Sequence, residues 1–409
     1  MSDRIVIVGA GHAGTQTAVF LRQNGHSGAI AVVSQDADAP YQRPPLSKKY
    51  LTGGLSDAQI ALRPEQWFTD NDVLMYLGAE VVQLDLDESL VTLRDGEELK
   101  YDRLLLATGS RLRHLEVPGA DLPNVHYLRT AEDSRKLGDA FGEGKRVAVI
   151  GGGYIGLEVA ASARQMGLEV TVLERAERLL PRVASAELAG AIARLHQREG
   201  VTVRCGANVT ALEGDETCVQ AVVLEGGERV AADVVVIGIG VTAETALAED
   251  AGLRVDNGIV VDEFCQTSNP RVYAAGDCTS HPNKFVRHRV RLESVPNATQ
   301  QARTAAAAMT GTLTAYTEAP WFWSEQYAVR MQTAGLPDAR YETVLRGDPA
   351  SDAFALFHLD GGRLMGVEAL NRVQEFMFGR KLIEAQVEVD ERLADESESF
   401  KSIAEALLG

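Results

Sequence analysis

The sequence is poor in cysteine and has no long hydrophobic run. Its 409 residues include four cysteines, none spaced as a CxxC pair, so neither a zinc site nor a disulfide framework is indicated and a reducing cytoplasm fits best. No run of 18 apolar residues occurs, and we therefore expect no membrane span. A first strand already begins after Arg4, which leaves no room for a signal peptide.

Positive charge is also in short supply. The chain has 40 lysines and arginines against 58 aspartates and glutamates, a formal net charge of −18. This balance argues against nucleic acid as a partner. An acidic protein partner would also be repelled at long range unless the surface carried a local basic patch.

Two glycine-rich motifs stand out against this background. Gly9–Gly14 reads GAGHAG and follows the apolar run Ile5–Val8, and Gly151–Gly156 reads GGGYIG and follows Val147–Ile150. Each predicts a strand, a tight turn and a helix, the geometry in which backbone N–H groups and a helix N-terminus receive a pyrophosphate. Two such fingerprints imply two dinucleotides in one protein, most commonly so that a hydride can pass from a nicotinamide to a flavin.

The spacing of later strands indicates an internal duplication. After each fingerprint the chain reaches an apolar strand that ends in glycine: Leu104–Ala107, introduced by Asp102, and Val234–Ile237, introduced by Asp233. The predicted fold class is α/β, with two Rossmann-like, doubly wound dinucleotide-binding domains and a C-terminal α+β domain. We expect the first domain to be discontinuous (residues 1–113 and 245–319), the second to span 114–244, and the third to span 320–409.

Acidic residues after the second strand of each half predict ribose contacts. Glu174 follows the strand Val170–Leu173, where a carboxylate accepts hydrogen bonds from ribose hydroxyls and repels a 2′-phosphate, so NADH should be preferred over NADPH. Arg175, Arg178 and Arg182 lie nearby and act against this preference, because an arginine can accommodate that phosphate. Asp36 is the corresponding acid of the first half.

The segment Pro40–Lys48, PYQRPPLSK, is the most specific short motif after the fingerprints. Together with both fingerprints, the ATG and AAGD strand ends and the segment Phe322–Gln326 (FWSEQ), it gives a resemblance that covers the whole chain. The sequence resembles the NAD(P)H-dependent ferredoxin and rubredoxin reductases that serve oxygenases, relatives of apoptosis-inducing factor in the glutathione-reductase superfamily. The resemblance assigns the first fingerprint to FAD and the second to NADH.

The resemblance also implies the residues of both cofactor sites. For FAD these are Gly9, Gly11, Ala13, Gly14, Gln35, Asp36, Arg43, Lys48, Val82, Ala107, Thr108, Arg129, Asp277 and Val295. For NADH they are Gly151, Gly153, Tyr154, Ile155, Gly156, Glu158, Glu174, Arg182, Gly238 and Gly240. The family often has an acid where this chain has Gln35. A helix that begins near Val295–Asn297 would aim its N-terminus at the flavin N1–C2=O edge and stabilise the negative charge that reduction places there.

Three residues are implied in the chemistry. Lys48 would lie close to the flavin N5 edge and Glu158 near the nicotinamide, and we hypothesise an ion pair between them. Trp323 adjoins Ser324 and Glu325, which favours a role beside the flavin, while packing in the core or at a domain interface explains it equally well.

A basic cluster interrupts the acidic chain shortly after Asp277. Lys284, Arg287, Arg289 and Arg291 would form a positive patch that steers an acidic ferredoxin to the flavin, although a run of charge is more often only a solvated face.

The absence of one superfamily motif indicates where the electrons go after the flavin. The disulfide reductases of the superfamily carry a Cys-x4-Cys pair in the helix after the first motif, and this chain has no cysteine there. We therefore expect a flavoprotein that takes a hydride from NADH onto FAD and passes single electrons to an iron–sulfur ferredoxin feeding an oxygenase. The alternatives are a rubredoxin reductase, or a slow redox-sensing flavoprotein of the apoptosis-inducing-factor kind. The oligomeric state stays open.

Overall fold

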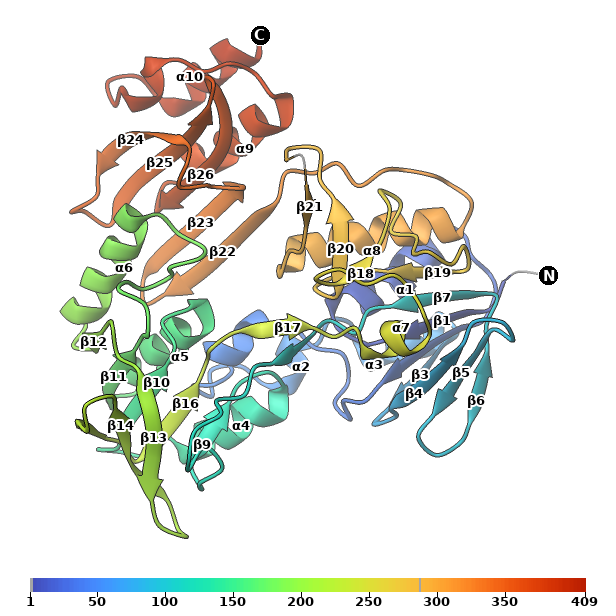
Figure 1. The fold of residues 1–409 in the computed structure, drawn as a ribbon. Helices are drawn as coiled ribbons and strands as arrows, with labels where there is room; N and C mark the ends of the chain where they lie inside the picture. Colours follow the sequence, from blue (N-terminus) through green and yellow to red (C-terminus); the bar gives the residue numbers. More distant parts are fainter. Residues whose placement is uncertain (1–2, 287) are drawn as a thin grey trace. The chain divides into compact units, whose positions relative to one another are not determined.

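The computed structural model describes residues 3–286 and 288–409 (Figure 1). Its helices are α1 (His12–Gln23), η1 (Pro44–Ser47, a 3₁₀ helix), α2 (Asp57–Ile60), α3 (Glu65–Asp70), α4 (Ala131–Ala140), α5 (Tyr154–Gln165), α6 (Ala186–Arg198), α7 (Ala246–Asp250), α8 (Val295–Met309), α9 (Val373–Ala385), η2 (Glu391–Ala394, also 3₁₀) and α10 (Phe400–Leu408). In the part of the chain described, no helix is both long enough and apolar enough to cross a membrane.

The strands fall into large sheets and smaller ribbons. They are β1 (Ile5–Val8), β2 (Ile30–Ser34), β3 (Val73–Leu77), β4 (Val81–Asp85), β5 (Leu90–Leu93), β6 (Glu98–Lys100), β7 (Arg103–Leu106), β8 (Ser110–Leu112), β9 (Val125–Tyr127), β10 (Arg146–Ile150), β11 (Glu169–Leu173), β12 (Thr202–Arg204), β13 (Val209–Gly214), β14 (Val219–Leu224), β15 (Arg229–Ala231), β16 (Val234–Ile237), β17 (Val241–Ala243), β18 (Ile259–Val260), β19 (Val272–Ala274), β20 (Thr279–Pro282), β21 (Arg289–Val290), β22 (Trp321–Gln326), β23 (Val329–Gly335), β24 (Glu342–Asp348), β25 (Ala353–Asp360) and β26 (Arg363–Leu370).

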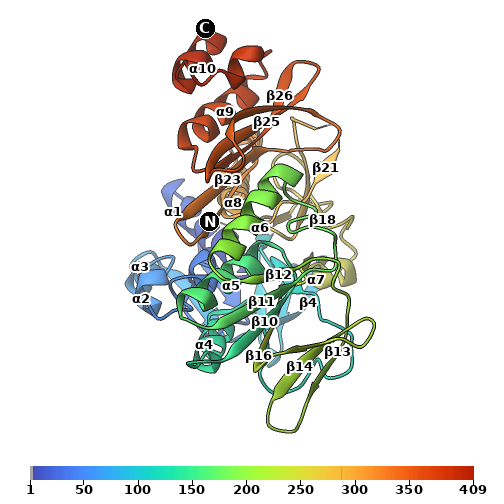
Figure 2. The same ribbon diagram turned by 90° about the vertical axis from the view of Figure 1, so that its left-hand side faces the viewer.

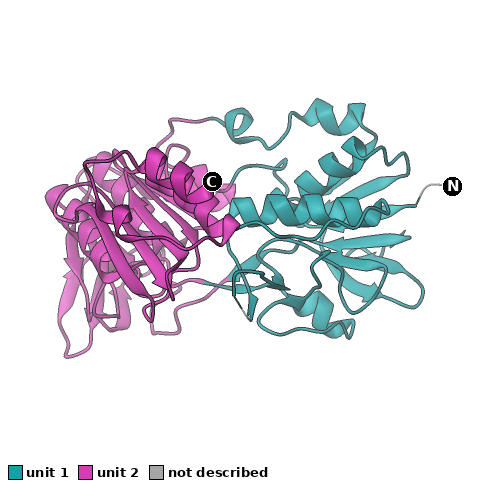
Figure 3. Cartoon of the chain, turned by 90° about the horizontal axis from the view of Figure 1, so that it is seen from above, with its two compact units in different colours: residues 1–42, 56–111, 241–320 teal, residues 43–55, 112–240, 321–409 magenta. Residues whose placement is uncertain are grey.

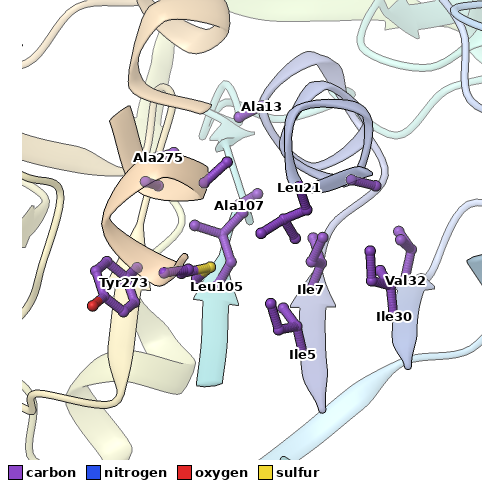
Figure 4. Close-up of a cluster of buried hydrophobic side chains, with 14 of the residues drawn as sticks. Ile5, Ile7, Ala13, Leu21, Ile30, Val32, Leu105, Ala107, Tyr273 and Ala275 are labelled. Carbon is purple, nitrogen blue, oxygen red and sulfur yellow. The ribbon is translucent and has the colours of Figure 1, made fainter. Parts of the chain in front are cut away.

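The first large sheet is parallel and has the strand order β19-β7-β1-β2-β3. Its central strand is buried on both faces: Ile5 and Ile7 belong to one apolar cluster, and Val6 and Val8 to another. Figure 4 shows Leu21 of α1 lying over Ile7 in the first of these clusters. Continuous β-branched runs suit a sheet with helices or other layers on both faces, which is why the sequence shows no alternation here.

The second large sheet repeats this plan, with the order β12-β11-β10-β16-β9 (Figure 2). In each half a three-stranded antiparallel ribbon, β4-β5-β6 or β13-β14-β15, stands in the chain between the third strand and the strand that pairs beside the first. The predicted duplication and the two Rossmann-like domains are thus confirmed.

The duplication extends to an ion pair that sequence reasoning missed. Asp102 binds the backbone N–H and the guanidinium of Arg4, and Asp233 binds the same two groups of Arg146. Each aspartate therefore joins the starts of two neighbouring strands of its sheet. Both aspartates stand out in the sequence before apolar strands, but their arginine partners do not, because pairing across a sheet is not visible in local sequence.

The C-terminal segment forms an antiparallel sheet with the order β22-β23-β26-β25-β24. Helix α9 packs against β26 and β23, and α10 packs against α9 (Figures 1 and 2). The Phe400 ring of α10 stacks on Phe357 of β25 with 5.0 Å between centroids. This confirms the predicted α+β character of the region.

The chain divides into two compact units, which Figure 3 distinguishes by colour. Unit 1 contains residues 1–42, 56–111 and 241–320, and unit 2 contains 43–55, 112–240 and 321–409. In this division 43–55 and the C-terminal sheet both group with the second dinucleotide domain. The limits of the three predicted domains stay a prediction.

Hydrogen bonds explain why 43–55 belongs to unit 2. The Ser134 hydroxyl donates to the Leu46 carbonyl and the Ser162 hydroxyl donates to the Ser47 carbonyl, both at 2.7 Å. These bonds are buried and join residues far apart in the chain, so the predicted domain limits, drawn from strand patterns alone, did not include them.

Candidate functional sites

In the first fingerprint each glycine has a distinct geometric role. Gly9 has φ +106°, and a Cβ there would lie 2.2 Å from the Ala107 carbonyl oxygen. A Cβ on Gly14 would lie 1.8 Å from the Gly9 oxygen, because α1 starts directly against the turn. A Cβ on Gly11, by contrast, would have no neighbour within 4 Å. The protein itself requires the outer glycines, and the middle one leaves open space where a ligand's phosphates can approach the backbone.

Four predicted FAD residues of unit 1 follow the ends of its strands. Asp36 is half-buried after β2, where it accepts the Tyr41 hydroxyl at 2.5 Å, while Gln35 is exposed. Thr108 follows β7 and donates to the Glu244 carbonyl. Asp277 follows β19 and accepts the Ser110 hydroxyl at 3.3 Å.

Two further predicted FAD residues of unit 1 lie at a helix start and on a ribbon. Val295 opens α8, whose N-cap Ser294 accepts the Asn297 N–H, so the helix begins where it was predicted. Val82 of β4 is 42% exposed.

The second fingerprint reproduces the geometry of the first. Gly151 has φ +112° and a Cβ there would lie 2.3 Å from the Gly238 oxygen, and a Cβ on Gly156 would lie 2.2 Å from the Gly151 oxygen. A Cβ on Gly153 would have no neighbour within 4 Å. Both turns therefore fit a bound pyrophosphate by the same criterion.

Glu174 is held at the second fingerprint by backbone donors. Its carboxylate accepts the Gly152 N–H at 2.7 Å and the Ala176 N–H at 2.8 Å. The acid after β11 therefore lies against the glycine turn, and its contact with a ribose stays a prediction. Arg182 is exposed, and its guanidinium lies 3.2 Å from where a Cβ of Gly240 would be. The Arg178 guanidinium, in contrast, donates hydrogen bonds to backbone carbonyls of the loop that follows β11.

Tyr154 and Ile155 begin α5 and face different surroundings. The Tyr154 ring lies 4.5 Å from the Phe322 ring and its hydroxyl donates to the Val183 carbonyl. Burial raises the pKa of Tyr154, because the charged phenolate is disfavoured away from water. Ile155 is 47% exposed beside the open glycine Gly153.

The hypothesised ion pair between Lys48 and Glu158 is present in unit 2. The Lys48 ammonium lies 2.6 Å from Glu158 Oε2, and the exposed fractions of the two side chains are 19% and 3%. Two serines complete the site: Ser47 Oγ donates to Oε2 at 2.5 Å, and Ser324 Oγ donates to Oε1 at 2.6 Å. A carboxylate this buried requires such donors. Both serines belong to the sequence motifs PYQRPPLSK and FWSEQ, but the sequence predicted no role for either.

Arg43, Arg129 and Trp323 also belong to unit 2. The Arg43 guanidinium donates to the Arg129 carbonyl, so the structure brings these two predicted residues together. Trp323 lies on the face of β22 opposite to Ser324, with its ring 5.5 Å from that of Trp321. Its role beside the flavin stays a prediction.

The basic cluster is less uniform than its sequence suggests. Lys284 is exposed and lies over the Phe285 ring at 4.8 Å, whereas Arg287 lies outside the described residues. The Arg289 guanidinium donates to the carbonyls of Val261 and Ser280, and burial lowers its pKa.

Arg291 is also engaged inside the cluster: its side chain is only 16% exposed and pairs with Glu293 at 2.5 Å. Two of the four predicted docking residues are thus held by their own unit.

Comparison with known proteins places the whole chain. Residues 3–302 match the pyridine nucleotide-disulphide oxidoreductase family, and 321–404 match the reductase C-terminal family. Rhodocoxin reductase of Rhodococcus erythropolis is 44% identical over 94% of this chain and 90% of its own length. Putidaredoxin reductase of Pseudomonas putida is 40% identical over 99% of this chain and 97% of its own.

Solved structures agree with the sequence comparison. The reductase in the covalent putidaredoxin reductase–putidaredoxin complex superposes with a TM-score of 0.96 at 39% identity, covering 99% of both chains. The chain therefore belongs to the pyridine nucleotide-disulphide oxidoreductase family, on the branch that includes rhodocoxin and putidaredoxin reductases.

Proposed function

We propose that this chain is a cytoplasmic, FAD-containing ferredoxin reductase that uses NADH. The observation that carries the proposal is the pair of glycine turns, each with a sterically open middle glycine, at Gly11 and Gly153. Relatives named as reductases of small redox proteins along nearly the full chain support the acceptor class. All four cysteines lie in the described part of the chain and are free, which favours a reducing compartment.

FAD supplies the chemistry that the side chains lack, because it accepts a hydride from NADH and releases electrons singly to a one-electron acceptor. In unit 1 the turn at Gly9, Gly11 and Gly14 would hold its pyrophosphate and Asp36 would bind its adenosine ribose. The N-terminus of α8 at Val295 would supply a partial positive charge that favours the reduced, anionic form.

In unit 2 the turn at Gly151, Gly153 and Gly156 would hold the pyrophosphate of NADH. Glu174 would accept hydrogen bonds from the ribose hydroxyls, and its negative charge would repel the 2′-phosphate of NADPH. The Lys48–Glu158 pair keeps an ammonium charge in one place, and a fixed positive charge stabilises the negative charge that accompanies hydride transfer. No general acid or nucleophile is required.

We place ferredoxin docking on the basic cluster around Lys284, Arg287, Arg289 and Arg291. Because Arg289 and Arg291 are engaged inside unit 1, we assign them to shaping the surface. Lys284 and Arg287 would then supply the charge that steers an acidic partner towards a chain of net charge −18.

The main test is electron transfer by the purified protein. NADH should bleach the bound FAD rapidly in stopped-flow, and an iron–sulfur ferredoxin should then be reduced faster than rubredoxin. Slow bleaching with a long-lived charge-transfer complex would indicate a redox sensor instead. A colourless preparation that FAD cannot reconstitute would refute the proposal.

Two glycine substitutions should separate the cofactors. In both variants the added methyl meets no protein atom and lies where a pyrophosphate approaches. Gly11→Ala should therefore fold normally and lose FAD. Gly153→Ala should keep FAD and raise KM for NADH about tenfold or more. Flavin absorbance and steady-state kinetics measure both effects. Full FAD content in Gly11→Ala would contradict the assignment, and Gly14→Ala, with its 1.8 Å clash, serves as the unfolding control.

Glu174 should determine the choice of nicotinamide cofactor. Glu174→Gln keeps one carbonyl acceptor and removes the charge, so the ratio of kcat/KM for NADH to that for NADPH should fall roughly tenfold, mainly through better use of NADPH. Glu174→Ala should also lose efficiency with NADH. An unchanged ratio in both variants would show that the residue does not select the cofactor.

Charge reversal tests the docking surface. Lys284→Glu and Arg287→Glu should each raise KM for ferredoxin about tenfold at low ionic strength, and the difference from wild type should shrink as salt is added. Lys136→Glu, at a lysine 63% exposed on α4, is the charge-matched control and should leave KM unchanged. Ferredoxin reduction that does not respond to salt or to either reversal would exclude this surface.

A further inference from the structure

A chain of buried hydrogen bonds begins at Glu158 Oε1, whereas Lys48 pairs with Oε2. From Glu158 on α5 it passes to Ser324 and Gln326 on β22 and then to His196 on α6, all within unit 2. The exposed fractions of Ser324, Gln326 and His196 are 1%, 2% and 0%. Ser324 and Gln326 are two residues apart on one strand, so they share its inward face.

The chemistry of the donors fixes the direction of this chain. The Glu158 carboxylate, paired with Lys48, only accepts, so the single Ser324 proton is committed to Oε1 at 2.6 Å. Ser324 Oγ must then accept from the Gln326 amide nitrogen, 3.2 Å away. That places the Gln326 carbonyl oxygen 2.8 Å from His196 Nε2, which must carry a proton.

The far end of the chain agrees with this direction. Burial lowers the pKa of His196 and so keeps its ring neutral, which leaves Nδ1 as an acceptor. The Tyr327 hydroxyl lies 3.4 Å from that nitrogen, and burial raises the pKa of Tyr327, so the hydroxyl retains the proton it would donate. Every member of the chain is satisfied in one orientation only.

We propose that Ser324, Gln326 and His196 are positioning residues for hydride transfer. They hold the Glu158 carboxylate, and through it the Lys48 ammonium, in one place, and the charge of Glu158 in turn selects the Nε2–H tautomer of His196. The part concerning hydride transfer rests on the proposed function, and the part concerning the tautomer does not. Fully satisfied buried networks of this kind specify a single arrangement.

The tautomer is read by ¹⁵N NMR of the FAD-loaded protein labelled at histidine, with His196→Asn identifying the resonances. Wild type should show His196 as the Nε2–H tautomer at about pH 8, above the ordinary pKa of histidine. In Glu158→Gln the new amide can donate to Ser324, so the chain can reverse and His196 should shift towards Nδ1–H. In Ser324→Ala the further change Glu158→Gln should have no effect on His196.

Either of two results would overturn the selection of the tautomer by Glu158. The first is an unchanged His196 signal in Glu158→Gln. The second is the same response to Glu158→Gln with and without Ser324, which would mean that the effect does not pass through the serine.

The positioning role is measured by stopped-flow reduction of the flavin at saturating NADH. Ser324→Ala should slow reduction about tenfold without changing the Kd for NADH, because one charged hydrogen bond to Glu158 is lost. Ser89→Ala, at a serine 4% exposed in unit 1, should leave the rate unchanged. A wild-type rate in Ser324→Ala would refute the positioning role while leaving the proposed function intact. If NADH failed to reduce the wild-type flavin, the proposed function would fail. The NMR result would still decide whether Glu158 sets the direction of the hydrogen bonds from Ser324 to His196.

Discussion

The buried carboxylate of Glu158 is the interaction on which the organisation of unit 2 depends. A charge that is 3% exposed must be surrounded by donors, and here they come from two segments far from α5 in the chain: Ser47 of η1 with the following Lys48, and Ser324 of β22. The same requirement explains why 43–55 and the C-terminal sheet group with the second dinucleotide domain. The hydrogen bonds of Glu158 therefore hold separate segments of unit 2 together, in addition to their proposed role in the reaction.

The glycine turns impose a second constraint, repeated in both halves. Each helix starts so close to the end of its strand that a Cβ on the third glycine would lie about 2 Å from the carbonyl oxygen of the first (1.8 Å at Gly14, 2.2 Å at Gly156). The N-terminus of the helix is left open at the middle glycine. In each half a ribbon of three antiparallel strands also occupies the same place in the chain, before the strand that pairs beside the first. The matched pairs Arg4–Asp102 and Arg146–Asp233 show that the duplication reaches single side chains.

Charge clusters illustrate the limit of reading function from a linear pattern. Lys284 and Arg289 look equivalent in sequence, yet one is exposed and the other donates to two backbone carbonyls. An arginine provides several donors in a fixed plane, so it can bind two neighbouring backbone carbonyls at once. In such a surface some cationic residues, like Arg289, hold the backbone in place, and others, like Lys284, expose their charge to solvent.

From the sequence alone we predicted the two dinucleotide domains, the positions of the glycine turns and Glu174 directly after β11, and the family resemblance led to the hypothesis that Lys48 pairs with Glu158. These features depend on residues close together in the chain, or on motifs whose residues are required by one particular backbone geometry. Only the tertiary structure revealed Ser47 and Ser324 on Glu158, the path through Gln326 to His196, and the attachment of 43–55 to unit 2. The contacts of Ser47 and Ser324 with Glu158 join residues 111 and 166 positions apart. They form because a buried charge needs donors, and the fold decides which donors lie near it.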